Sequence, residues 1–313
     1  MSVFQQKLQQ MRRYGGLLLL LLSCAASSRA QSKVQVVTRT LEQTLPCPAS
    51  VLVRVRAEKA TLRVQAWDKP TVRVVLRLIA RHPERETAEK ELSVARYLIE
   101  KNGGVIDLVN YFALAPGAPA VRSDLRAEYT IQMPAANPLQ VVNAYGQTYL
   151  TGLSGKQKLE QDFGQITLQD LRGSLDATIR YVDLSAANTI FTFTCDADKS
   201  ALRFTEAGGS YSIRNRYGSV LLEPGAELKS VFIDAQRTEV TIRVPQLSAF
   251  HYNLSTAHST LTVPAGYEGS LRKTTSQSSL RVSTPVRLPL IRVLTSYAPI
   301  TLQTLPMPML MRR

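Results

Sequence analysis

The sequence has few of the residues that commonly carry catalysis, metal binding or cross-linking. Its 313 residues include three cysteines, three histidines and one tryptophan. The histidines, His82, His251 and His258, lack the spacing of a metal site. Cys47 and Cys195 are far apart, so the sequence leaves open whether they pair in an oxidising compartment. We therefore predict no catalytic, cofactor or metal site from these residue types.

No apolar run is long enough to span a bilayer, which takes about 20 residues. The longest run begins at Leu17 and ends near Ala26. Basic residues precede it at Lys7, Arg12 and Arg13. A positive region followed by a short apolar core is typical of an export signal.

The same segment ends in small residues that a signal peptidase recognises. Ser28 and Ala30 occupy the two recognised positions, so we predict cleavage between Ala30 and Gln31 and a signal peptide over residues 1–30. The stretch ending at Cys24 also resembles a bacterial lipobox, in which Cys24 would be acylated. Both alternatives predict an exported protein that is periplasmic, on the outer surface or secreted.

Charge of one sign predominates without forming a block. Lysine and arginine number 38 against 24 acidic residues, a net charge of +14, and they are spread along the chain. For an exported protein this charge suits envelope polysaccharide, anionic lipid or extracellular DNA, but solvated strand faces explain it without a ligand and are the favoured interpretation. No nucleic-acid-binding motif is present, so we predict no specific nucleic-acid partner. An envelope polysaccharide, a cell surface or a protein partner stays open.

One triplet, Asp162-Phe163-Gly164, matches the magnesium loop of protein kinases. The glycine-rich loop, the strand lysine and the His-Arg-Asp loop that a kinase also needs are missing from the sequence. After the triplet, Ile166 and Leu168 alternate with polar residues, which is typical of a strand with one buried face. We therefore interpret the triplet as part of a β structure.

This alternation belongs to a repeat of 18 to 21 residues. Equivalent corner positions occur at Gly146, Gly164, Val182, Ser200, Gly218, Thr238, Ser259, Ser278 and Ala298. Nearly every unit has apolar side chains two and four residues after the corner, and five and seven residues before it. Two short strands with one apolar face cannot bury that face alone, whereas stacked units can. We predict an all-β fold with a β-solenoid or β-roll of about nine two-strand rungs over residues 137–304; an antiparallel sandwich is the alternative.

The part before the repeat, residues 31–136, is predicted to be rich in β structure with one inserted helix. Strands are expected over 51–56, 60–64, 71–78, 105–109 and 127–133, with a loop over 113–124. Residues 83–101 contain helix formers throughout, and Ala88, Leu92, Ala95 and Ile99 have helical spacing. We predict an amphipathic helix there, and a tail over residues 305–313.

The order of these segments resembles the bacterial DUF4097 family of exported, adhesin-like domains. The resemblance rests on the turn "AWDKP", the entry "PLQVVNAYG" and the repeated "FGQITLQDL" units, and it covers residues 48–304. It implies a β-helical cell-envelope protein, with no catalytic residue to carry over. Val182, Ser200 and Thr238 depart from the glycines that would be typical at the corners, which calls the flatness of those rungs into question.

Some polysaccharide lyases and hydrolases also have a β-solenoid fold, so the outward acidic residues are candidates for catalysis. These are Asp162, Asp170, Asp183, Asp196, Asp198, Asp234 and Glu239. A glycosidase needs two carboxyl groups roughly 5 to 10 Å apart. In this sequence no acidic residue recurs at the same position of successive repeats. We expect an exported, non-enzymatic cell-envelope protein, an adhesin or scaffold. The alternatives are a carbohydrate-active β-helix enzyme and an envelope signalling accessory with a protein partner. Open strand edges also predict self-association.

Overall fold

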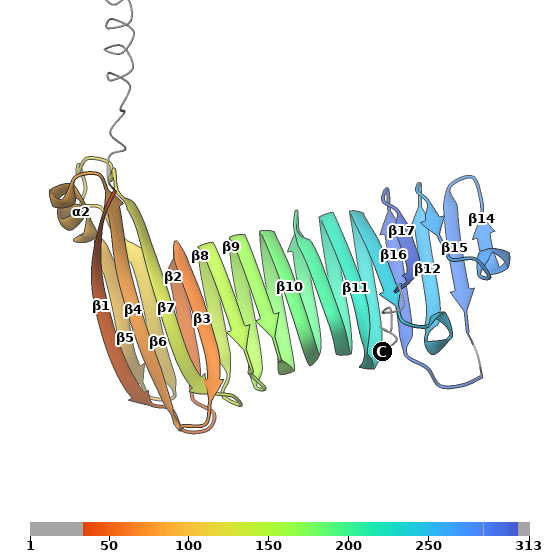
Figure 1. The fold of residues 1–313 in the computed structure, drawn as a ribbon, viewed down its shortest axis with the longest axis horizontal. Coiled ribbons are helices and arrows are strands. Elements are labelled where there is room, and N and C mark those ends of the chain that lie inside the picture. Colours follow the sequence, from red (N-terminus) through yellow and green to blue (C-terminus); the bar gives the residue numbers. More distant parts are fainter. Residues whose placement is uncertain (1–33, 284, 306–313) are drawn as a thin grey trace, which may run out of the picture.

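The computed structural model describes residues 34–283 and 285–305. All the strands of this part belong to one 17-stranded sheet in which most neighbouring strands are parallel. Figure 1 shows them side by side along the long axis of the molecule, from β1 at one end to β14 at the other. The all-β prediction is confirmed.

The strands and the short helices follow one another in chain order. They are β1 (Gln35–Pro46), β2 (Leu52–Glu58), β3 (Ala60–Trp67), β4 (Thr71–His82), α2 (Arg85–Leu92), β5 (Ala95–Asn102), β6 (Val105–Phe112), β7 (Asp124–Pro134), β8 (Leu139–Thr151), β9 (Lys156–Gln169), β10 (Arg172–Asp198), β11 (Ala201–Val244), η2 (Leu247–Ala249), β12 (His251–Ala257), β13 (Leu261–Thr262), η3 (Glu268–Ser270), β14 (Leu271–Lys273), β15 (Gln277–Val282), β16 (Leu290–Ser296) and β17 (Ile300–Thr304).

Strands β8 to β11 form a parallel stack in which β8 with β9, β9 with β10 and β10 with β11 each pair at an offset of 18 residues. Leu139 pairs with Gln157, and Gln157 pairs with Leu175. The same step joins Leu184 to Leu202 between β10 and β11. Alternate side chains face the interior, and the apolar positions of the sequence repeat in these layers are buried. The predicted inward face is therefore confirmed for this stack.

The corners of the stack accept two kinds of residue. A Cβ on Gly164 would lie 1.9 Å from the carbonyl oxygen of Gly146, so a side chain cannot fit there. At Val182, Ser200 and Thr238 the side chain is buried instead. The Thr238 hydroxyl donates to the Asn215 carbonyl at 3.1 Å. Pairing continues on both sides of these corners, as in the register of β9 with β10.

The C-terminal units do not follow chain order, which corrects the prediction of a sequential stack. Strands β16 and β17 pair in parallel with the end of β11 on one side. On the other side they pair in parallel with β12 and β13. β15 then pairs antiparallel with β12 and with β14. The physical reason is that any strand with the same inward pattern can satisfy an open parallel edge, so periodicity alone does not fix the order. The nine-rung solenoid stays a prediction.

The N-terminal part extends the sheet beyond β8. Strands β2 and β3 pair in parallel with β8, and also with β6 and β7 respectively. β4 pairs antiparallel with β7 and with β1. The strands predicted from the sequence in this part are confirmed. The turn "AWDKP" is present as well, where the Trp67 indole donates to the Thr71 carbonyl at 2.7 Å.

The predicted helix over residues 83–101 is wrong in its second half. The helix α2 ends at Leu92, and residues 95–102 form β5, which pairs antiparallel with β6. The turn after Asn102 contains Gly103 at φ +57°, which suits a tight hairpin. Hairpin pairing with β6 therefore overrode the helical spacing of Ala95 and Ile99. Within the described residues, no helix is long and apolar enough to cross a membrane.

Candidate functional site

One corner of the sheet carries a continuous row of exposed side chains, which we name the corner ridge. Each member lies immediately before a corner and has a backbone φ between +49° and +62°. Strand register and side-chain contacts place neighbouring members on neighbouring layers. In spatial order the ridge consists of Lys59, Tyr145, Phe163, Tyr181, Lys199, Tyr217, Arg237, Tyr297 and His258.

Aromatic and cationic side chains of the ridge stack on one another. The rings of Tyr145 and Phe163 are parallel with centroids 5.0 Å apart, and Phe163 stacks on Tyr181 at 4.9 Å. The Lys199 ammonium lies 4.8 Å from the Tyr181 ring centroid and donates to the Tyr181 hydroxyl at 2.7 Å. At the other end, the rings of His258 and Tyr297 are stacked at 5.0 Å.

Stacking offsets the unfavourable backbone of the ridge. A residue other than glycine in the left-handed region costs about 1–2 kcal/mol. An aromatic pair contributes about 0.5–1.5 kcal/mol beyond its buried area. A ring such as Phe163, which stacks on both sides, therefore recovers about what its backbone costs. The ridge is thus explained structurally along most of its length, and a binding role has to be sought where a ring face is open.

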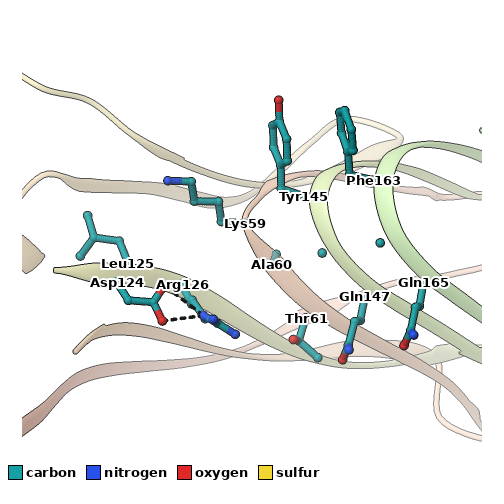
Figure 2. Close-up of a pocket in the computed structure, with 12 residues that line it drawn as sticks. Lys59, Ala60, Thr61, Asp124, Leu125, Arg126, Tyr145, Gln147, Phe163 and Gln165 are labelled. Carbon is teal, nitrogen blue, oxygen red and sulfur yellow. Dashed lines mark hydrogen bonds and ion pairs between the residues drawn. The ribbon is translucent and has the colours of Figure 1, made fainter. Parts of the chain in front are cut away.

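Such an open face occurs at Tyr145. Its side chain is 58% exposed, and one ring face packs on Phe163. Tyr145 and Phe163 both line a pocket of about 510 Å³. Figure 2 shows Tyr145 and Phe163 projecting side by side, with the Lys59 side chain directed away from them. The first ring of the stack is therefore available to a ligand.

Polar groups from three strands and one turn line the same pocket. Gln147 and Gln165 come from neighbouring strands β8 and β9 and lie side by side in Figure 2. Across the pocket, the Arg126 guanidinium donates to both carboxylate oxygens of Asp124, at 3.1 and 2.9 Å. Lys59, from the turn between β2 and β3, also lines the pocket. An open aromatic face with amide and charged groups around it suits the apolar C–H face and hydroxyl groups of a sugar.

A buried polar network holds the backbone under Tyr145. The Asn143 amide donates to the Ala60 carbonyl at 3.2 Å and to the Thr148 hydroxyl at 3.1 Å. That hydroxyl donates to Gln161 at 2.6 Å, and the Gln161 amide donates to the Gly146 carbonyl at 3.1 Å. Because these groups are buried and bonded, the corner is fixed before any ligand arrives.

The outward acidic residues that the sequence offers as catalytic candidates lie on the surface, and most of them face basic or amide groups. Asp162 is 3.1 Å from the Arg180 guanidinium. Asp196 and Asp234 lie on either side of Arg214, at 3.8 and 4.0 Å. The Asn188 amide donates to Asp170 at 2.6 Å. Exposed ion pairs of this kind contribute little and account for these carboxylates without an acid–base pair.

The histidines and cysteines are separated in the structure. His258 belongs to the corner ridge, His251 lies within 2.9 Å of the Val286 carbonyl, and His82 precedes α2. Cys47 and Cys195 are both buried and free. Burial raises the pKa of the Cys195 thiol to about 12, with Asp196 adding to it. Among the described residues, no cluster of three or more His, Cys, Asp or Glu side chains could hold a metal ion.

Three predicted features lie outside the described residues. They are the signal peptide with its cleavage between Ala30 and Gln31, the acylation alternative at Cys24, and the tail from residue 306 onward. These stay predictions.

Comparisons with known proteins give weak similarities. No family model matches the chain. The curated proteins contain no match either.

Three solved structures align over most of the chain. One is described as a putative cell adhesion protein from Clostridium sporogenes, with 8% identity, 87% of this chain and 100% of that chain covered, and a TM-score of 0.23. A second is described as a putative lipid binding protein from Parabacteroides distasonis. It has 10% identity, with 84% of this chain and 96% of that chain covered, and a TM-score of 0.43. A third is described as a putative adhesin from Bacteroides fragilis. It has 7% identity, with 87% of this chain and 97% of that chain covered, and a TM-score of 0.28. With TM-scores below 0.5, these structures indicate no function for this chain.

Proposed function

We propose that this chain is an exported, non-enzymatic scaffold of the cell envelope that adheres to carbohydrate through the Tyr145 end of the corner ridge. The open ring face of Tyr145, held in a pocket with amide and charged groups, is the observation that carries this proposal. A β-solenoid of about nine rungs, as in the adhesin-like family that the sequence resembles, would present that ring at a rigid corner. The aligned solved structures described as adhesion proteins are compatible with this role.

The same surroundings support a proposal of binding without a chemical step. In the Tyr145 pocket the one carboxylate of the lining is Asp124, and it is bonded to Arg126. Glycoside hydrolysis needs a second carboxyl group at a defined distance, and the lining supplies none from the described residues. We therefore infer binding without turnover.

The test is a screen of the purified chain from Gln31 onward against neutral and acidic oligosaccharides, with Tyr145→Asn as the probe variant. Asparagine tolerates a left-handed backbone, so this change removes the ring while keeping the corner. We expect Tyr145→Asn to weaken binding by roughly tenfold or more, about 1.4 kcal/mol or above.

The matched control is Tyr297→Asn, which removes an equally exposed ridge tyrosine, 59% against 58%, far from the pocket. It should bind like the unchanged chain. Equal loss in both variants, or release of new reducing ends from any bound glycan, would contradict the proposal. Intact mass of the chain recovered from its native host checks export by distinguishing cleavage before Gln31 from acylation at Cys24.

A further inference from the structure

A second hollow lies at the opposite end of the molecule and has a different chemistry. It has a volume of about 720 Å³ and is lined by side chains of β12, β14, β15 and β16 and of the segments beside them. In Figure 1 these strands lie near the end of the row that finishes with β14. We name it the arginine basin, because Arg272, Arg281 and Arg292 line it.

Strand pairing places the three arginines on one solvent-facing surface. Arg281 of β15 lies opposite Asn253 of β12, and Asn253 lies beside Arg292 of β16. Arg281 and Arg292 are thus two strands apart, about 10 Å. Arg272 of β14 is opposite Ser279, one diagonal step from Arg281. The arrangement suits a ligand with more than one acidic group.

The basin supplies no negative charge of its own to neutralise the arginines. None of its described lining residues is acidic, and none of the three arginines forms an ion pair within the described part of the chain. Arg292 is held against the Phe232 ring, with its guanidinium carbon 5.5 Å from the ring centroid. Unpaired guanidinium groups gathered in a hollow are the usual means of binding carboxylate, sulfate or phosphate groups.

The remaining lining distinguishes between kinds of anion. Asn253, Ser255, Ser270, Gln277, Ser279 and Ser283 provide amide and hydroxyl groups that both donate and accept hydrogen bonds. Gln277 already donates to the Ser255 hydroxyl at 2.8 Å, which orders part of this set. A free inorganic anion would leave most of these groups unused. A nucleic acid would be expected to need stacking rings, and the described lining contains no aromatic side chain.

The geometry points to the arginine basin as a binding site for an acidic oligosaccharide, with the arginines taking its charged groups and the amides and hydroxyls taking its sugar hydroxyls. This goes beyond the proposed function, because the basin shares no residue with the Tyr145 pocket. Either site can therefore fail without the other.

The experiment uses calorimetry on the whole chain from Gln31 onward with hexagalacturonic acid, neutral maltohexaose and inorganic phosphate as probes. The double variant Arg272→Gln with Arg281→Gln should bind hexagalacturonic acid at least tenfold more weakly. Raising the salt from 50 to 500 mM should weaken binding of the unchanged chain by a similar factor, because the charges are solvent-exposed. Maltohexaose should not bind in the basin.

The control is the double variant Arg203→Gln with Arg216→Gln, which makes the same charge change at exposed positions outside the basin. It should retain hexagalacturonic acid binding. The proposal is overturned if both arginine pairs reduce binding equally, since net charge would then be the cause. It is also overturned if hexagalacturonic acid does not bind, or if inorganic phosphate or anionic phosphatidylglycerol vesicles bind the basin as tightly. Circular dichroism of each variant checks that the β fold is kept.

Discussion

The parallel stack and the C-terminal segment, residues 251–304, share an inward pattern but use it differently. In the stack, pairing advances by 18 residues from β8 to β11 in strict chain order. In the C-terminal segment, β16 and β17 insert between β11 and β12, and β15 turns antiparallel. The same alternation of apolar and polar residues therefore supports two pairing schemes.

Corner geometry and the inward face fix the order of the layers. In the stack the first four steps, from Gly146 to Gly218, are each 18 residues, and glycine corners such as Gly164 bring the backbones of neighbouring layers very close together. In the C-terminal segment, Lys273 takes an inward position of the repeat but is exposed. Gly266 has nothing within 4 Å of an added Cβ. Tight corners and a complete apolar face thus favour stacking in chain order. A segment that lacks them can adopt another strand order.

The largest contrast between the two regions is expected in their interiors. Phe193 is fully buried and forms edge contacts with Phe191, Phe204 and Tyr211. Phe193→Ala should lower the free energy of unfolding by about 3–5 kcal/mol. Leu271→Ala, at a partly buried position of β14, should cost about 1 kcal/mol or less. Urea denaturation of both variants measures this contrast, and similar losses would show that the two regions are equally well packed.

A smaller contrast is expected at the glycine corners. Gly164 has a φ of +119°, and an added Cβ would meet the Gly146 carbonyl. Gly164→Ala combines backbone strain with steric displacement, so we expect a loss of about 3 kcal/mol. Gly266→Ala has the same kind of unfavourable φ, +91°, in open space, and should cost about 1 kcal/mol. The midpoints and slopes of urea denaturation separate the two, and a cost at Gly266 equal to that at Gly164 would rule out the close approach as the cause.

The sequence allowed most strand positions and the inward face of the repeat to be predicted, because alternation is a local property of a strand; β1 was not predicted. The order of the C-terminal layers could not be predicted, because pairing between distant strands depends on which edges are open. The exposed Lys273 and the unequal steps after Thr238 were signals of that change. The helix predicted up to residue 101 failed for a similar reason, since hairpin pairing of β5 with β6 is not visible in helical spacing.

The candidate site was visible only in part. An aromatic residue precedes several corner positions of the repeat, including Tyr145 and Phe163, but the spacing alone does not show that these rings stack on one another. Lys59 belongs to the same ridge although it precedes Tyr145 by 86 residues, because β2 and β3 lie beside β8. The basin was missed because Arg272, Arg281 and Arg292 converge only through the rearranged pairing of β12, β14, β15 and β16.

The smallest contrast lies on the corner ridge itself and tests whether stacking supports it. Phe163 is stacked between two parallel rings, whereas Tyr297 contacts one imidazole ring and the more distant Arg237. Phe163→Asn removes two ring contacts but relieves an unfavourable backbone, because asparagine tolerates the left-handed region. We expect a net loss of about 1 kcal/mol for Phe163→Asn and about 0.5 kcal/mol or less for Tyr297→Asn. Denaturation of the two variants in parallel measures the difference. If Phe163→Asn were instead as stable as the unchanged chain, stacking would not be what holds these rings in place, and the ridge would have to be explained by what it binds.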